Sequence, residues 1–253
     1  EVIPFIKVWV LLPMAILVTL IFTKLSNRYS QERVFYLTIS SFLLFFGAFT
    51  FIFYPFRDFI HPHQLANSLE ATLPAGFKGL VAMFRNWSFT IFYVICELWG
   101  SMVLSVLFWG FANEVTKITE ARRFYSMLGL VASFAGIFAG VAANYVTNDQ
   151  SWEATLRILV SIIIACGCLT MLTFWWMNKN VLVGENFDEL HKTKNELKPK
   201  QKLSMRESFS YLSNSKYLIC IAVLVVCYNL VINLVEIVWK DQLRQLYPST
   251  VEY

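Results

Sequence analysis

The sequence predicts an all-α, polytopic membrane protein. Of its 253 residues, 57% are hydrophobic and 15% are charged, whereas a soluble domain carries roughly 25% charged residues. Mean hydropathy is +0.55. Several stretches longer than the roughly 18 residues that mark a membrane span hold one charge or none. Most of the chain is therefore expected to lie in a bilayer.

Six apolar runs are long enough to cross about 30 Å of hydrocarbon at about 1.5 Å per helical residue. They are Phe5 to Phe22, Val34 to Tyr54, Phe89 to Ala112, Met127 to Val146, Ile158 to Met177, and Tyr217 to Trp239. Each is predicted to be a helix, because a lipid-exposed backbone must satisfy its hydrogen bonds internally and the alternation of a barrel strand is absent.

The six spans differ in the polar groups that they carry. The second, fourth and fifth hold no charged residue, and the first, third and sixth hold one each: Lys7, Glu97 and Glu236. The fourth has a small-residue face that includes Gly136 and Gly140, a spacing typical of a close helix contact.

The positions of Lys and Arg predict the orientation. The first, third and fifth connections hold fourteen of these residues, and the second and fourth hold four. The positive-inside rule places the first set in the cytoplasm or its equivalent, so the first visible helix starts outside. We therefore expect one further span before Glu1, which makes these helices two to seven of a larger protein.

The connections predict the domain organisation. The longest, 178–216, contains a charge-alternating segment without an apolar face, which we interpret as a cytoplasmic linker between two halves. A patch that binds anionic lipid headgroups is the alternative. Residues 1–177 would form an N-terminal transmembrane half that lacks its first span, and 217–253 the truncated first span of a C-terminal half. The second connection, Pro55 to Ser88, carries apolar residues suited to the outer membrane interface.

Charged side chains inside spans cost about 2.5 to 3.5 kcal/mol each on insertion scales, so each is a candidate functional residue. Glu97 shares a helical face with Ser101 and Ser105, with Tyr93 one turn earlier and Gly100 beside them. Such a small, polar face is suited to lining a cavity. An alternative is that Glu97 is a protonated acid bonded to a neighbouring helix, and that Lys7 reaches the outer headgroups.

The last span carries a polar stripe at helical spacing. Its members are Asn229, Asn233, Glu236 and Lys240. We expect this stripe to face the bundle interior, where Glu236 could share one cavity with the charges of the first and third spans. The alternative is that Glu236 pairs with Lys240 one turn later.

Other motifs carry little chemistry. The five cysteines lie in apolar runs without a C-x-x-C pair and are interpreted as small buried hydrophobes. His61-Pro62-His63 lacks the partners of a metal site, and no P-loop, H-E-x-x-H or G-x-S-x-G occurs. We therefore expect no enzyme, no metal and no cofactor, and the net charge of +4 is no evidence for nucleic-acid binding.

Several segments, spread along nearly the whole chain, match one family. They are Ile3-Pro4-Phe5-Ile6-Lys7-Val8-Trp9, Arg85-Asn86-Trp87, Glu97-Leu98-Trp99-Gly100-Ser101, Phe108 to Glu114, and Asn233-Leu234-Val235-Glu236 with Trp239-Lys240. The sequence resembles the bacterial and plastid nucleotide transporters, the ATP/ADP translocases, and is most similar to the chlamydial ADP,ATP carrier type. It would cover about the first half of such a protein.

The resemblance implies twelve spans in a fold like the major facilitator superfamily. It also implies exchange of ATP for ADP, in a bacterial inner membrane as energy parasitism or in a plastid inner envelope as ATP supply. The expected partners are ATP and ADP, with phosphate as a further candidate, and membrane lipid. We expect a monomer that binds no nucleic acid.

The resemblance also implies the site. Lys7, Glu97 and Glu236 match charged residues that the family needs for transport, and a further lysine belongs to the absent half. The full set of candidate substrate-binding residues is Lys7, Tyr93, Glu97, Asn233, Glu236 and Lys240. A proton-coupled nucleotide importer is the nearest alternative function; a membrane receptor or a membrane-embedded enzyme would belong to another class.

Overall fold

The fold comes from a computed structural model that describes residues 3–116, 118–147, 151–181, 210 and 214–246. In this part of the chain every regular element is a helix. Six helical stretches are long and apolar enough to cross a membrane, and they coincide with the six predicted spans. The all-α, multi-pass membrane fold is thus confirmed.

Several spans are composites of α- and π-helix. The first comprises α1 (Ile3–Ile6), η1 (Lys7–Leu11) and α2 (Leu12–Arg28); the second α3 (Gln31–Ala48) and η2 (Phe49–Phe53); the third α7 (Trp87–Trp99), η4 (Gly100–Phe108) and α8 (Trp109–Val115). The fourth and fifth spans are α9 (Ile118–Thr147) and α10 (Trp152–Asn180), and the sixth lies in α13 (Lys216–Leu246). The elements η1, η2 and η4 are π-helical, which spacing arguments based on α-helices do not anticipate.

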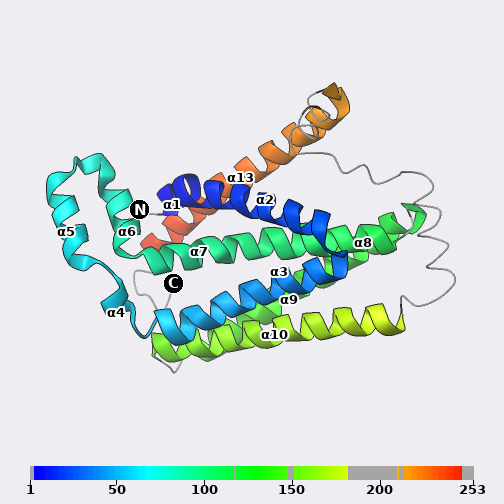
Figure 1. Ribbon diagram of the computed structural model, residues 1–253, viewed down its shortest axis with the longest axis horizontal. Helices are drawn as coiled ribbons and strands as arrows, with labels where there is room; N and C mark the ends of the chain where they lie inside the picture. Colours follow the sequence, from blue (N-terminus) through cyan, green and yellow to red (C-terminus); the bar gives the residue numbers. More distant parts are fainter. Residues whose placement is uncertain (1–2, 117, 148–150, 182–209, 211–213, 247–253) are drawn as a thin grey trace. The chain divides into compact units, whose positions relative to one another are not determined.

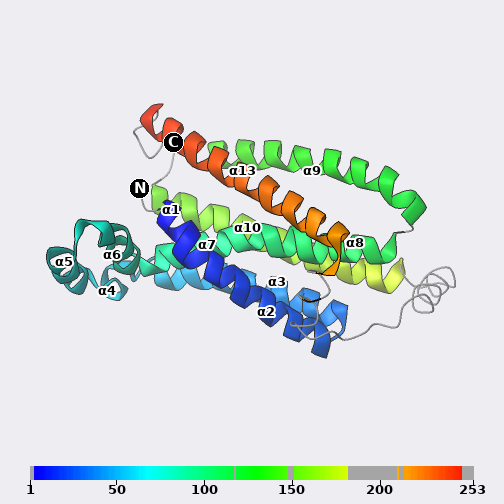
Figure 2. The same cartoon turned by 90° about the horizontal axis from the view of Figure 1, so that it is seen from above.

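The second connection is helical. It contains α4 (Arg57–Ile60), α5 (His63–Thr72), the short 3₁₀ turn η3 (Ala75–Phe77) and α6 (Lys78–Arg85), and we call residues 57–85 the cap. Figures 1 and 2 show the cap at one end of the spans, with α5 and α6 lying across the direction of α3 and α7. Its apolar residues, expected at the membrane interface, therefore belong to short helices that run roughly parallel to the predicted membrane plane.

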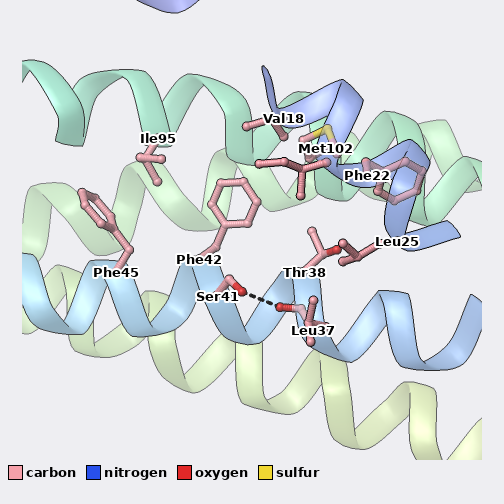
Figure 3. A pocket seen from close by; sticks show the side chains of 11 residues that line it. Val18, Phe22, Leu25, Leu37, Thr38, Ser41, Phe42, Phe45, Ile95 and Met102 are labelled. Atoms are coloured by element: carbon pink, nitrogen blue, oxygen red, sulfur yellow. Dashed lines mark hydrogen bonds between the residues drawn. The ribbon is translucent and has the colours of Figure 1, made fainter. Parts of the chain in front are cut away.

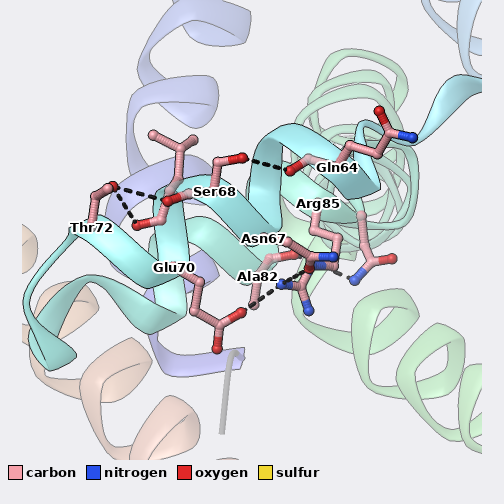
Figure 4. A network of polar contacts seen from close by, with 9 residues as sticks. Gln64, Asn67, Ser68, Glu70, Thr72, Ala82 and Arg85 are labelled. Carbon is pink, nitrogen blue, oxygen red and sulfur yellow. Dashed lines mark hydrogen bonds and ion pairs between the residues drawn. The ribbon is translucent and has the colours of Figure 1, made fainter.

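Polar contacts hold the two long helices of the cap together. An Arg85 guanidinium nitrogen donates to Asn67 Oδ1 at 2.9 Å and to Glu70 Oε2 at 2.5 Å (Figure 4). The Arg85 side chain of α6 thus bonds to two residues of α5 that lie about one helical turn apart.

Two hydrophobic clusters lie between the spans. In one, Phe35, Ile39 and Leu43 of α3 pack with Leu107 of η4 and Phe174 of α10. The rings of Phe35 and Phe174 stack with centroids 3.8 Å apart. The other cluster joins α1, the cap, α3, α7, η4 and α10, and it includes residues next to Lys7 and Glu97 in sequence.

One prediction about packing was wrong for the described residues, because all five cysteines are exposed on the chain. Lipid tails are as apolar as a protein core, so an apolar run predicts a span without predicting which face is covered by protein. A Cβ placed on Gly136 or Gly140 would meet nothing within 4 Å among the described residues, and a close helix contact of this face stays a prediction.

The chain divides into two compact units, Glu1–Phe187 and Asp188–Tyr253. The boundary falls within the predicted linker, most of which lies outside the described residues. The described helix of the second unit, α13, begins one residue before the predicted sixth span. Each unit is considered by itself below.

Candidate functional site

Lys7 is the first residue of η1, directly after the single turn of α1, and its side chain is partly buried. The sequence explains the π-helix that follows it. Pro13 has no N–H to donate and its ring clashes with the carbonyl four residues earlier, so an α-helical turn cannot continue unchanged through Trp9. The widened turn gives Lys7 a backbone setting that is common at functional sites.

Glu97 lies in the last turn of α7, and η4 begins three residues later at Gly100. Glu97 and Tyr93 are both partly buried. The predicted face that continued through Ser101 and Ser105 assumed α-helical spacing. Ser101 and Ser105 lie in the π-helical η4, whose turn is wider than that of an α-helix, so the continuation of this face through them stays a prediction.

The structure brings the helices of Lys7 and Glu97 together. Element η1 packs on α7. Ile6, next to Lys7, is buried in the same cluster as Val94 and Leu98, which flank Glu97. Two charged residues 90 positions apart in sequence are therefore carried by adjoining segments of one unit. The residues next to each charge in sequence are thus packed in one apolar cluster.

The polar stripe of α13 forms contacts within its own helix. Lys240 Nζ donates to Glu236 Oε1 at 2.6 Å, an i,i+4 ion pair. The Asn233 amide donates to the Asn229 carbonyl at 2.8 Å. The alternative interpretation of Glu236, pairing with Lys240, is thus the arrangement in this unit. A common cavity with Lys7 and Glu97 stays a prediction, because α13 belongs to the other unit.

A cavity of about 290 Å³ lies between α2, α3 and the third span (Figure 3). Nearly all of its lining is aliphatic or aromatic, and the Ser41 hydroxyl donates to the Leu37 carbonyl at 2.7 Å. No cation lines it, so its chemistry does not suit a nucleotide polyphosphate. None of the predicted site residues lies in it.

Sequence reasoning missed the role of His61. Its Nε2 lies 2.7 Å from Ser88 Oγ in a buried hydrogen bond, which ties the end of α4 to the start of α7. Burial lowers the pKa of His61; His63 and Arg57 also lower it, while Asp58 opposes them. The only sequence signal was a histidine beside Pro62, which indicates a turn but no partner. Within the described residues, no group of three His, Cys, Asp or Glu side chains could hold a metal.

Comparison with known proteins gives a consistent result. The sequence matches the TLC ATP/ADP transporter family over residues 1–253. It is 44% identical over 264 residues to ADP,ATP carrier protein 1 of Chlamydia pneumoniae, covering 100% of this chain and 51% of the relative. No solved structure matches the chain.

Plastid and rickettsial proteins are similarly related. ADP,ATP carrier protein 1, chloroplastic, of Arabidopsis thaliana is 44% identical over 261 residues, covering 100% of this chain and 41% of the relative. ADP,ATP carrier protein 1 of Rickettsia prowazekii is 42% identical over 258 residues, covering 100% and 51%. The chain spans about half the length of these relatives. With six membrane-spanning helices and a match along its whole length, the chain belongs to the TLC ATP/ADP transporter family.

Proposed function

We propose that the full-length protein exchanges ATP for ADP across a membrane by alternating access. The observation that carries this proposal is the family match over residues 1–253. The packing of the Lys7 segment on the helix of Glu97 supports it from the structure. Relatives occur in bacteria and in chloroplasts, so a bacterial inner membrane is the proposed location and a plastid inner envelope the alternative.

Lys7 is the proposed contact for the nucleotide phosphates. An ammonium group in a partly dehydrated site attracts phosphate oxygens more strongly than one in open water. Lys7 is partly buried at the start of η1, next to the buried Ile6, which supports this role. The transported phosphate chain would replace water around this side chain.

Glu97 cannot attract phosphate directly. We assign it a complementary role: it holds cationic side chains in the empty site, or accepts a hydrogen bond from the ribose or the adenine amino group. Tyr93, one turn earlier on α7, offers a ring for stacking on adenine. In the other half of the site, Asn233, Glu236 and Lys240 would contribute polar contacts, with the Glu236–Lys240 pair opening as the nucleotide binds.

The exchange would respond to the membrane potential. ATP carries about one more negative charge than ADP, so each cycle moves about one net charge, worth roughly 2.3 kcal/mol per 100 mV. Rocking of the two halves around a central site would expose it to each side in turn.

A proton-coupled importer is the second candidate, favoured by the intramembrane carboxyl groups of Glu97 and Glu236. Either group could bind and release a proton during transport. Such an importer would lose its activity when the proton gradient collapses, whereas an exchanger would continue with ADP on the opposite side.

The test is uptake of labelled ATP by cells that express the full-length protein, with the proton gradient collapsed and ADP loaded inside. We expect uptake coupled to ADP release, and loss of uptake in Lys7→Gln with normal membrane insertion. Lys24→Gln is the matched control, because Lys24 is exposed in the same span. Normal uptake by Lys7→Gln would exclude the role of Lys7. Uptake that depends on the proton gradient and does not require ADP inside the cell would favour the importer.

A further inference from the structure

The cap is fixed to the helix that carries Glu97. Three hydrogen bonds join it to the first turn of α7. They link His61 Nε2 to Ser88 Oγ (2.7 Å), Trp87 Nε1 to the Ile60 carbonyl (3.2 Å), and Thr90 Oγ1 to the Met83 carbonyl (3.3 Å). Because these bonds involve the end of α4 and the body of α6, the cap is held to α7 at two places.

The same cap touches the helix that carries Lys7. Helix α6 packs on α1, and Figure 1 shows α6 beside the N-terminal turn. The contact is closest at Gly79: a Cβ on this residue would lie 2.9 Å from both Cγ and Cδ2 of Phe5. Real Cβ atoms essentially never approach that closely, so any side chain larger than hydrogen at this position would require the Phe5 side chain or α1 to shift. Phe5 precedes Lys7 by two residues.

The contact continues into the cluster between the two charges. Met83 of α6 is 6% exposed and is buried with Ile6, Val94 and Leu98. These three neighbours lie beside Lys7 or on either side of Glu97 in sequence. One helix of the cap therefore packs against the segments on which both charged residues lie.

We propose that the cap sets the position of Lys7 relative to Glu97, and that Gly79 and Phe5 are positioning residues for the nucleotide site. The cap is bonded to α7 and abuts α1, so it acts as a spacer between the two helices. A bulkier residue at position 79 must move α1 or force Phe5 into another χ1 rotamer. The clash includes Cγ of Phe5, and rotation of the ring about χ2 leaves this atom in place. This inference rests on the proposed nucleotide site.

The test compares Gly79→Val with Gly76→Val in the full-length protein. Gly76 lies in the same cap, but a Cβ there would meet nothing within 4 Å, so the control adds the same side chain without the clash. We expect Gly79→Val to weaken ATP binding roughly tenfold, since small misplacements of a binding group are costly, and Gly76→Val to bind ATP as the wild type does.

A second-site change separates positioning from general damage. Phe5→Ala removes the ring that the new side chain would meet. The ATP affinity of the Gly79→Val/Phe5→Ala double variant should therefore lie within about twofold of that of Phe5→Ala alone. Such non-additivity is expected of residues in contact. The loss in Gly79→Val should also shrink as salt is raised, because salt screens the attraction between Lys7 and the phosphates. A fold defect would not depend on salt in this way.

The outcomes separate this inference from the proposed function. If the wild type shows no saturable ATP binding, both fail. If the wild type binds ATP and Lys7→Gln does not, but Gly79→Val binds normally, only the positioning role fails. Failure of Phe5→Ala to rescue Gly79→Val would likewise overturn it, and a salt-dependent loss with rescue would establish it.

Discussion

At the scale of single residues, His61 joins the cap to α7 through a hydrogen bond that the sequence did not predict. His61 is 6% exposed and is hydrogen-bonded to Ser88, and the centroid of its ring lies 5.3 Å from that of the Phe89 ring. Which of the two partners donates depends on the imidazole tautomer. A charged imidazolium in this place would lose hydration and would face the nearby Arg57 and His63.

His61 should make the docking of the cap dependent on pH. Its pKa is lowered in the folded protein, below the ordinary value of about 6.5 that applies when the cap is undocked. The stabilisation is therefore complete above about pH 6.5 and declines below it, because the undocked form takes up a proton that the docked form resists. Hydrogen exchange of residues 57–72 should thus show more frequent opening near pH 5.5 than near pH 7.5 once intrinsic rates are corrected. His61→Phe should abolish the difference, His63→Gln should keep it, and an unchanged pH dependence in His61→Phe would assign it to another group.

At the scale of elements, α3 and α10 pack through a glycine. A Cβ on Gly167 would lie 2.5 Å from Cδ2 and 2.7 Å from Cδ1 of Leu43. Gly167→Ala should therefore lower the free energy of unfolding of the full-length protein in detergent by about 1–3 kcal/mol, the usual cost of overpacking. Gly129→Ala is the matched control, because a Cβ at Gly129 has open space. Leu43→Ala should partly relieve the strain, so strictly additive effects of the two substitutions would contradict this packing.

The elements also show where sequence reasoning succeeded and where it stopped. Span number and limits were predictable because the bilayer demands about 20 apolar residues per helix. The π-helices were not predicted, although Pro13 and Pro55 each lie two residues after one, and a proline obstructs the preceding α-helical turn. The η4 segment has no such proline, so nothing in its sequence indicated a π-helix after Glu97.

At the scale of the whole molecule, sequence predicted the architecture better than the site. The resemblance implied that Lys7 and Glu97 belong to the site. The packing between their two segments, however, involves Ile6, Met83 and Val94, and many lipid-facing residues are equally apolar. Nothing in their sequence distinguishes an apolar residue facing protein from one facing lipid. The contact of Gly79 with Phe5 could not be predicted from the sequence either, because the two residues lie 74 positions apart.

The orientation of the molecule follows from its charges and can be tested directly. By the positive-inside rule, the excess of Lys and Arg in the odd connections predicts that the cap lies outside. Phe59 in the cap is 92% exposed, and Asn27 is exposed at the opposite end of the first span. In intact cells an impermeant maleimide should label Phe59→Cys, and should label Asn27→Cys only after permeabilisation. The wild type measures the background from native cysteines, five of which lie in this chain. The reverse pattern would invert the topology, and would place the cap on the cytoplasmic side and Lys7 and Glu97 in the inner half of the membrane.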